Sequence, residues 1–281
     1  MADREIISQA LHVIKQELQG VVESPRREAE LLMMAHLECD QLFLMMHTED
    51  TVADIEKLYE WTQRRKNHEP LEYITNSVSF YSQIFHIEAG ALIPRAETEL
   101  LIDEVLKCVE KEANIQIVEV GVGSGIISIV LAQHLKNARF IAVDISDEAL
   151  HVARRNLERF GLSKRIELRQ SDLLDNVAES IDLLVSNPPY IANEAPLEDN
   201  LSYEPQNALF GGEIGDEIIK ELIELTCKRH IKTFICEMGY DQKEKVKAHL
   251  KDYKSVSLDF YKDYANFDRG FIMKSGENFE K

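Results

Sequence analysis

The stretch between residues 115 and 239 alternates short apolar runs with polar or amphipathic segments, and this alternation constrains the fold more than any other feature of the chain. The lengths of the runs suit buried strands, while several of the segments between them have the period of a helix. Strands that are joined through helices form parallel sheets with helices on both faces, so the sequence predicts an α/β, doubly wound, mainly parallel sheet. The runs are IQIVEVG, RFIAVDIS, IELRQSD, IDLLVSN and TFICEMG.

Both flanks of this region have a different pattern. After it, the runs SVSLDFY and GFIMKS have no helix between them, which predicts an antiparallel last strand at the sheet edge. Before it, apolar residues recur at helical spacing and the pair Ser24-Pro25 is typical of a helix start. From Tyr73 to Ile93 the apolar residues alternate instead, which predicts a β-hairpin. We therefore expect a small helical bundle over residues 1–72, a β-hairpin linker over 73–94 and the sheet domain over 95–281.

Composition excludes several classes of protein. The longest apolar run, Ile126–Ala132, is far shorter than the roughly 20 residues of a membrane-spanning helix. The first residues are polar and charged, so we expect a soluble, cytoplasmic protein without a membrane segment, and a monomer by default. No histidine pair has metal-ligand spacing and no two cysteines form a CxxC pair, so we expect no metal and no disulfide framework.

A glycine-rich loop follows the first apolar run, in the sequence Glu119-Val-Gly121-Val-Gly123-Ser-Gly125, and opens into a helical segment. Glycines let the backbone approach a ligand closely, and a helix start offers free N–H donors; a tight turn packed on the sheet is the alternative interpretation. Asp144 closes the second run, where its carboxylate can accept hydrogen bonds from both ribose hydroxyls of an adenosine. Asp172 closes the third run, next to where an adenine would lie. Three such signals at one sheet edge predict an adenosine cofactor.

The residues around the loop favour S-adenosylmethionine over a dinucleotide. The dinucleotide fingerprint GxGxxG requires a third glycine where this chain has Ile126. Glu119 would repel a pyrophosphate, but it could help to hold a cationic ammonium group. The pattern ExGxGxG followed by acids after the next two strands resembles the class I methyltransferases, whose antiparallel last strand also fits the terminal hairpin.

The fourth apolar run continues into Asn187-Pro188-Pro189-Tyr190 at the same predicted sheet edge. The Asn187 side chain and the Pro188 carbonyl can accept the two protons of one planar NH2 group and orient it for attack on a methyl group, while the prolines hold the turn rigid. Tyr190 can stack on the flat group that is methylated. An ordinary strand-ending turn is the alternative interpretation. Adenine N6, cytosine N4, guanine N2 and the glutamine side-chain amide all present such a nitrogen.

Charge distinguishes between these substrates. The formal net charge is -18, and both the helical part and the rest of the chain are acidic. Enzymes that act on nucleic acids need a basic footprint for phosphates, so this balance argues against direct nucleic-acid binding.

Over nearly its entire length the chain is similar to the peptide chain release factor glutamine methyltransferases, the HemK-like family. The motifs that carry this resemblance are LIPRAETELLIDEVL, EVGVGSGIISI, AVDISDEALHVARRN, SNPPYI, YEPQNALFGG and DYANFDRGF. The resemblance implies methyl transfer from S-adenosylmethionine to the side-chain amide nitrogen, N5, of the glutamine in the GGQ tripeptide of class 1 translation release factors. It also implies that the helical domain binds the release factor.

The resemblance assigns roles to individual residues. It implies that Asp172 or Leu173 lines the adenine pocket and that Asn187, Pro188 and Tyr190 are catalytic. The glutamine would be held by Asn187, Pro188, Pro189 and Tyr190. The expected cofactor-binding residues are Glu119, Gly121, Val122, Gly123, Ser124, Gly125, Asp144, Asp172, Leu173 and Asn187.

Arg95, Glu97 and Glu204 lie in motifs typical of the family. They could help to close the site, or they could be charges at a helix start and in a loop that face solvent. The chain departs from the family pattern at Ala96, where a second proline is common, and at Leu173, where an aromatic residue is common.

Three rival interpretations remain open from the sequence. An amino-methyltransferase of adenine or guanine in DNA or RNA would bind nucleic acid in a strongly salt-dependent way. A non-catalytic adaptor would bind the cofactor without turnover. A dehydrogenase would need glycine at position 126, where this chain has Ile126.

Overall fold

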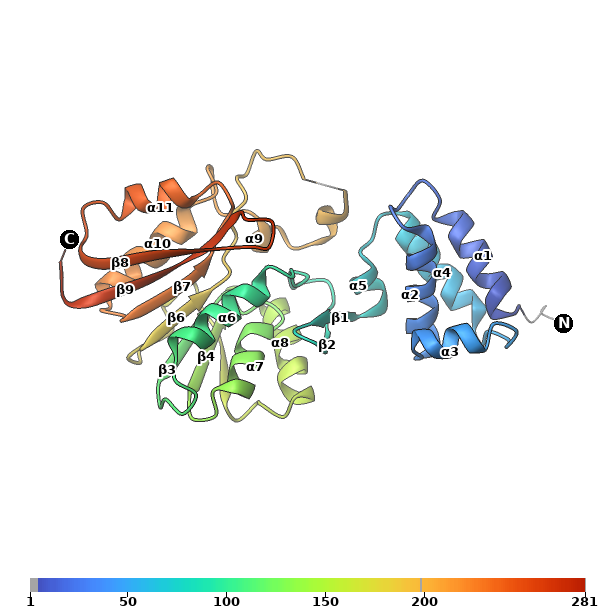
Figure 1. The fold of residues 1–281 in the computed structure, drawn as a ribbon, viewed down its shortest axis with the longest axis horizontal. Helices are drawn as coiled ribbons and strands as arrows, with labels where there is room; N and C mark the ends of the chain where they lie inside the picture. Colours follow the sequence, from blue (N-terminus) through green and yellow to red (C-terminus); the bar gives the residue numbers. More distant parts are fainter. Residues whose placement is uncertain (1–4, 198, 281) are drawn as a thin grey trace. The chain divides into compact units, whose positions relative to one another are not determined.

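The computed structural model describes residues 5–197 and 199–280, and they form two compact units (Figure 1). The first unit comprises Met1–Ser77 and Glu198–Tyr203, and the second comprises Val78–Leu197 and Glu204–Lys281. No helix within the described ranges has both the length and the apolar character that crossing a membrane requires.

The first unit is a bundle of short helices around its own apolar core. Pro25 occupies the first turn of α2, where its missing N–H costs no hydrogen bond, and Asp40 caps α3 by accepting a bond from the Phe43 N–H at 2.7 Å. A 3-10 helix, η1 (Asp199–Tyr203), belongs to the same unit, because the Tyr203 hydroxyl donates to the Asn67 carbonyl at 2.7 Å. The helices are α1 (Ile7–Glu17), α2 (Pro25–Leu37), α3 (Gln41–Met46), α4 (Ile55–Lys66) and α5 (Leu71–Thr75).

The hairpin is shorter than the alternating pattern predicts. Its strands are β1 (Ser77–Phe80) and β2 (Gln83–His86), whereas Tyr73 lies in helix α5. The reason is Asn76, whose left-handed backbone conformation (φ 51°) ends the helix and starts the strand. From Val78 onward the hairpin belongs to the second unit.

The second unit contains a seven-stranded sheet with the order β5-β4-β3-β6-β7-β9-β8. The first five strands in that order are parallel, and β9 is antiparallel to both β7 and β8, as the sequence predicts. The fold is therefore the α/β, doubly wound class I methyltransferase fold. The strands are β3 (Gln116–Val120), β4 (Arg139–Asp144), β5 (Ile166–Gln170), β6 (Leu183–Ser186), β7 (Thr233–Glu237), β8 (Lys254–Lys262) and β9 (Asp268–Glu280).

Helices cover the sheet, with α6, α7 and α8 on one side and α10 and α11 on the other (Figure 1). The side facing α10 and α11 is a continuous apolar core in which strand residues such as Val118 and Val120 pack against Ile219 and Leu222 of α10. The helices are α6 (Thr98–Cys108), α7 (Ile126–His134), α8 (Asp147–Arg159), α9 (Gln206–Leu209), α10 (Glu217–Lys228) and α11 (Lys243–His249).

One buried side chain connects the hairpin, α8 and the glycine loop. Asn156 of α8 is fully buried, and its side-chain oxygen accepts a hydrogen bond from the His86 N–H at 2.8 Å. Its Nδ2 donates to the carbonyls of His86 and Ser124, at 2.8 and 2.9 Å. A buried amide whose hydrogen bonds are all satisfied fixes its neighbours. Asn156 therefore holds the glycine loop in place through Ser124.

Candidate active site

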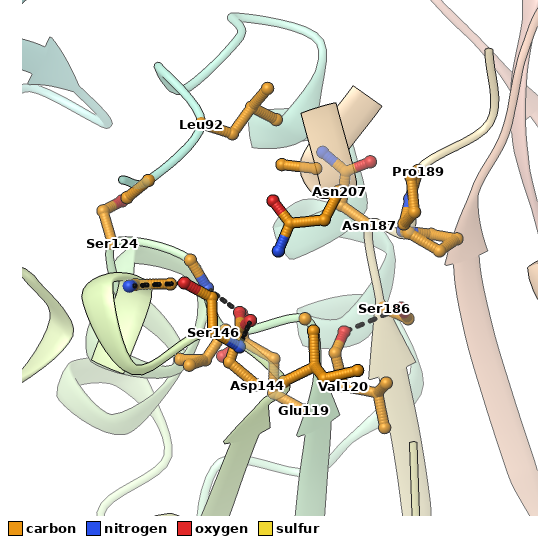
Figure 2. A pocket seen from close by; sticks show the side chains of 18 of the residues that line it. Leu92, Glu119, Val120, Ser124, Asp144, Ser146, Ser186, Asn187, Pro189 and Asn207 are labelled. Atoms are coloured by element: carbon orange, nitrogen blue, oxygen red, sulfur yellow. Dashed lines mark hydrogen bonds between the residues drawn. The ribbon is translucent and has the colours of Figure 1, made fainter. Parts of the chain in front are cut away.

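Strand register brings the predicted site residues together. Val120 of β3 pairs with Val143 of β4 on one side and with Ser186 of β6 on the other. The next residues along these three strands are Gly121, Asp144 and Asn187, which therefore meet at the carboxyl edge of the sheet. A cavity of about 330 Å³ opens at this edge, within the second unit (Figure 2). Its size and position are typical of a small-molecule site in an open α/β sheet.

The glycine loop needs its glycines for conformation and for packing. Gly121, Gly123 and Gly125 all have positive φ, between 53° and 83°, which other residues adopt at a cost. A Cβ on Gly125 would lie 3.3 Å from the Ala153 Cβ, so α7 and α8 also pack closely there. Gly125 is thus required by packing against α8, and the interpretation of Gly121 and Gly123 as a ligand cradle stays a prediction.

Asp144 holds the loop and faces the cavity (Figure 2). Its Oδ2 accepts a hydrogen bond from the Gly123 N–H at 2.9 Å, and its Oδ1 accepts one from the Ser146 N–H at 3.0 Å. Burial raises the pKa of this carboxyl, and these backbone bonds oppose that shift. Each oxygen keeps a second lone pair, so the carboxylate has the two acceptors that a ribose diol requires.

Glu119 lies in the cavity wall and is 1 % exposed. Its Oε2 accepts from the Ser128 N–H at 3.0 Å and from the Ser128 hydroxyl. Its Oε1 is buried without a hydrogen-bond partner in the part of the chain that the structure describes. Burial raises the pKa of Glu119 to about 8. An unpaired acceptor of this kind fits a cationic ammonium group, and S-adenosylmethionine carries one beside its sulfonium.

The predicted adenine side of the cavity is apolar. Leu173 is half-buried and has a positive φ of 42°, and Asp172 beside it is exposed. Both line the cavity, together with Leu92 and with Ile145, which follows Asp144. Ile145 is 55 % exposed, although large apolar residues are usually buried. A flat aromatic ligand would cover this side chain, so an adenine fits the surface.

Asn187 has a defined orientation. Its Nδ2 donates to the Thr98 Oγ1 at 3.2 Å, which leaves its Oδ1 available as an acceptor. Asn187, Pro188 and Pro189 all line the cavity. Figure 2 shows Asn187 and Pro189 on the side opposite Ser124. Tyr190 is not among the cavity-lining residues, and its hydroxyl donates to the Glu237 Oε1 at 3.4 Å. The stacking role expected of Tyr190 stays a prediction.

The turn formed by Asn187 to Tyr190 is held by a glycine segment that follows α9. The Ile191 N–H donates to the Leu209 carbonyl, and the Gly211 N–H donates to the Ile191 carbonyl, each at 2.9 Å. A Cβ on Gly211 would lie 2.3 Å from the Pro189 carbonyl oxygen, so only glycine fits at this position. Gln242 adds a side-chain bond to the Tyr190 carbonyl at 3.1 Å.

Arg95 and Glu204 form an ion pair, at 2.5 Å, that joins two walls of the cavity. Glu204 is 4 % exposed, and its other oxygen accepts from the Ile93 N–H at 2.9 Å. The interpretation of Glu204 as a solvent-facing charge is therefore wrong, whereas the Arg95 side chain that pairs with it stays one-third exposed. Glu97 is different, since it is substantially exposed and lies 4.0 Å from Arg269.

Sequence reasoning missed two polar residues of the site. Thr98 is buried at the start of α6 and contacts Asn187. Asn207 of α9 is exposed and extends into the cavity beside Asn187 (Figure 2). Both lie inside motifs typical of the family, LIPRAETELLIDEVL and YEPQNALFGG, but nothing in the spacing of those motifs shows which side chain faces the site.

Known proteins with similar sequences are methyltransferases. Residues 97–204 match the family model of the methyltransferase small domain, and residues 9–75 match that of the PrmC N-terminal domain. A release factor glutamine methyltransferase of Dictyoglomus turgidum is 40% identical over 88% of this chain and 90% of its own length. One of Koribacter versatilis is 38% identical over 84% and 86%.

Solved structures agree on the fold. The catalytic domain of hMettl16 in complex with a MAT2A 3'UTR hairpin has a TM-score of 0.55, with 17% identity over 80% of this chain and 81% of its own. A methyltransferase from Pyrococcus furiosus has a TM-score of 0.52, with 17% identity over 68% and 88%. At such identities the likeness shows the class I methyltransferase fold alone.

Proposed function

This chain belongs to the family of release factor glutamine methyltransferases, and we propose that its cavity binds S-adenosylmethionine and the glutamine of the GGQ motif of class 1 translation release factors. The methyl group is transferred to the side-chain amide nitrogen, N5, of that glutamine. The observation that carries the proposal is the Asn187 turn, which presents a fixed amide oxygen beside a cavity with acceptors for an ammonium and a ribose.

Different residues of the cavity bind different parts of the cofactor. Glu119 Oε1 receives the ammonium, Asp144 receives the ribose hydroxyls, and Asp172 with Leu173 lines the adenine side. The loop Gly121, Val122, Gly123, Ser124 and Gly125 lets the backbone approach the ligand closely. Bound S-adenosylmethionine supplies a methyl group on a positively charged sulfur, which is the electrophile of the reaction.

Asn187 and Pro188 prepare the nucleophile. The lone pair of an amide nitrogen is delocalised, so the group reacts slowly unless it is positioned. The Asn187 Oδ1 and the Pro188 carbonyl accept the two N–H bonds of the glutamine side chain and hold its nitrogen toward the methyl group. Methyl transfer to the nitrogen held by Asn187 and Pro188 would leave the donor as an uncharged thioether, and the nitrogen would then release one of its two protons to water. No charged base is needed while the bond forms.

The two units have different roles in this proposal. The helical part, residues 1–72, binds the release factor, the hairpin region over 73–94 links it to the rest, and residues 95–281 carry catalysis. The match of residues 9–75 to the PrmC N-terminal domain supports this division. The net charge of -18 supports a partner with basic surface and argues against direct contact with nucleic acid. The enzyme acts as a monomer in the cytoplasm, where its substrate works.

Peptide mass spectrometry tests the proposal. An unmodified release factor is incubated with the protein and S-adenosylmethionine, beside a twin whose GGQ glutamine is replaced by alanine. We expect one added methyl group on that glutamine and none on the twin. The variant Asn187→Ala keeps cofactor affinity within about threefold and loses turnover by roughly 100-fold or more, because only the orienting bonds are lost.

A methyl group found instead on RNA or DNA, in a parallel reaction without release factor, would favour the nucleic-acid alternative. Cofactor binding without transfer to any of these substrates would favour an adaptor.

A further inference from the structure

The Asn187 side chain is held from behind by a buried polar cluster that the proposed reaction does not itself use. Thr98, the first residue of α6, is 2 % exposed, and Glu237, the last residue of β7, is 1 % exposed. The register pair Ser186–Cys236 between β6 and β7 places the next residues, Asn187 and Glu237, side by side. The cluster is therefore adjacent to the turn that receives the substrate amide in the proposed reaction.

The hydroxyl of Thr98 has one proton to donate and two lone pairs to accept with. It accepts the Asn187 Nδ2–H at 3.2 Å, so its own proton is free for another acceptor. The Glu237 Oε2 can accept that proton, because this atom is buried and has no hydrogen-bond partner among the described residues. Burial raises the pKa of the Glu237 carboxyl to about 7, and interaction with the Thr98 side chain opposes that shift. Tyr190 donates to the same carboxyl, at 3.4 Å to Oε1. The ionised carboxyl of Glu237 can therefore accept from the hydroxyls of both Thr98 and Tyr190.

This direction decides how the Asn187 amide lies. With the Thr98 proton drawn toward Glu237, Thr98 presents a lone pair to Asn187, and only the NH2 group of Asn187 can use it. The amide oxygen then faces the cavity. In the opposite orientation the Asn187 NH2 would meet the NH2 of the substrate, and neither group could accept a hydrogen bond. That orientation would also turn the Asn187 oxygen toward Thr98 and lose the bond there, where water cannot replace it because Thr98 and Glu237 are closed to solvent.

We propose that Thr98, oriented by Glu237, is a positioning residue that fixes the side-chain amide of Asn187 with Oδ1 toward the substrate. The inference rests on the proposed function, because the orientation matters only if Asn187 accepts an N–H of the group that is methylated. Thr98 lines the same cavity, but its hydroxyl is bonded to Asn187, and its proposed effect on the reaction is transmitted through that bond.

The test is a single-turnover measurement of methyl transfer to the release factor by wild type, Thr98→Val and Thr98→Ser. Valine keeps the shape of threonine and removes the hydroxyl, so we expect the rate to fall by roughly 30-fold while the affinities for cofactor and release factor change less than about threefold. Serine keeps the hydroxyl and should retain the rate within about threefold. Thr226→Val is the matched control, because the Thr226 hydroxyl is buried in α10 and donates to its own helix at the Leu222 carbonyl.

A double-mutant cycle separates positioning from a general loss of structure. Since Thr98 acts through Asn187, the variant Thr98→Val/Asn187→Ala should be no slower than Asn187→Ala alone. Additive losses would overturn the inference, and so would a wild-type rate in Thr98→Val or a serine variant as slow as the valine variant. A wild-type protein that methylates no release factor would instead overturn the proposed function, whatever the variants do.

Discussion

Glu119 combines burial, an unpaired oxygen and a place in the cavity wall, and its proposed contact with the ammonium group predicts that cofactor binding depends on pH. Burial raises the pKa of the Glu119 carboxyl to about 8, so this carboxyl is largely protonated at neutral pH when no cofactor is bound. Binding a cationic ammonium requires the ionised form, and the ligand therefore displaces a proton from Glu119. Affinity should rise with pH as long as this proton must be removed and the ligand stays cationic.

We predict that the affinity for S-adenosylmethionine increases up to about tenfold per pH unit between about pH 6 and pH 7.5. Isothermal titration calorimetry over this range, in buffers of different ionisation enthalpy, measures both the affinity and the protons released. Glu119→Gln should bind more weakly and lose most of the pH dependence, since glutamine has no proton to give up. An unchanged pH slope in that variant would show that another group titrates.

The same shift has a consequence for stability. The unfolded chain ionises Glu119 near the usual carboxyl pKa of 4.5, whereas the folded protein keeps the proton up to about pH 8. The folded state therefore binds more protons in this window, and the contribution of Glu119 to the free energy of unfolding falls as pH rises through it. Cofactor binding opposes this loss, because it stabilises only the folded protein.

Position 211 requires glycine because there is no room for a Cβ beside the turn formed by Asn187 to Tyr190. A Cβ there would lie 2.3 Å from the Pro189 oxygen and 2.8 Å from the Gly215 oxygen, and both are backbone atoms that cannot move independently. We predict that Gly211→Ala lowers the free energy of unfolding by about 1–3 kcal/mol and reduces turnover more than cofactor affinity. Thermal unfolding and turnover assays check this. Gly276→Ala, whose Cβ would meet its nearest atom at 3.3 Å, should change both little; equal effects in the two variants would contradict the explanation.

At the scale of single residues, the sequence predicted the site residues that directly follow strands. It missed those that reach the site only through tertiary packing. Asp144 and Asn187 could be placed because the carboxyl ends of parallel strands all lie at one edge of the sheet. Thr98 and Asn207 could not, because their position depends on how α6 and α9 pack over that edge. A sequence motif shows that a segment matters without showing which of its side chains faces the site.

At the scale of elements, the cavity is a sheet edge covered by two segments that one ion pair joins. Leu92 and Pro94 come from the segment before α6, while Asn207 and Ala208 come from α9. The pair between Arg95 and Glu204 connects these two walls. Removing Glu204 leaves the Arg95 guanidinium without its counterion and the buried Ile93 N–H without its acceptor, and such losses usually cost more than the bonds themselves contribute.

We predict that Glu204→Ala lowers the free energy of unfolding by about 2 kcal/mol and weakens cofactor binding roughly tenfold, because both walls lose their connection. Denaturant unfolding and calorimetric titration measure the two effects. Glu167→Ala is a suitable control, since Glu167 is 61 % exposed and pairs with Arg169 on the surface. Its loss should cost under about 1 kcal/mol. A Glu204→Ala variant with wild-type affinity would show that the walls hold their positions independently.

The elements were predictable to different degrees. Periodicity over long segments identified the parallel strands and the antiparallel end of the sheet, because burial on both faces imposes long apolar runs. It misplaced the start of the hairpin, because five residues of alternation are too few to separate a strand from the short helix α5. The hairpin turn itself uses Tyr81 and Ser82 in left-handed conformations, and the Tyr81 N–H is held by Glu99 at 2.7 Å. Such a tertiary contact leaves no local signal.

At the scale of the whole molecule, the excess of acidic residues extends over both units, and the protein carries a formal net charge of -18. A field of this sign attracts basic surfaces from a distance and repels phosphate backbones. Electrostatic attraction acts mainly on the encounter between partners, whereas orientation of the reacting amide depends on short contacts in the cavity. Salt should therefore separate recognition of the release factor from catalysis.

We predict that the KM for the release factor rises roughly tenfold between about 50 mM and 300 mM salt, while kcat changes less than about twofold, because screening shortens the reach of surface charges to a few ångströms. Steady-state kinetics at several salt concentrations measures both constants, with cofactor affinity as the internal control. Added duplex or single-stranded nucleic acid should not compete, since an acidic protein has no counterion release to gain from phosphates. A KM that stays constant with salt would show that apolar contacts, not charges, recognise the release factor. Inhibition by nucleic acid would show that the protein has a basic surface patch despite its negative overall charge.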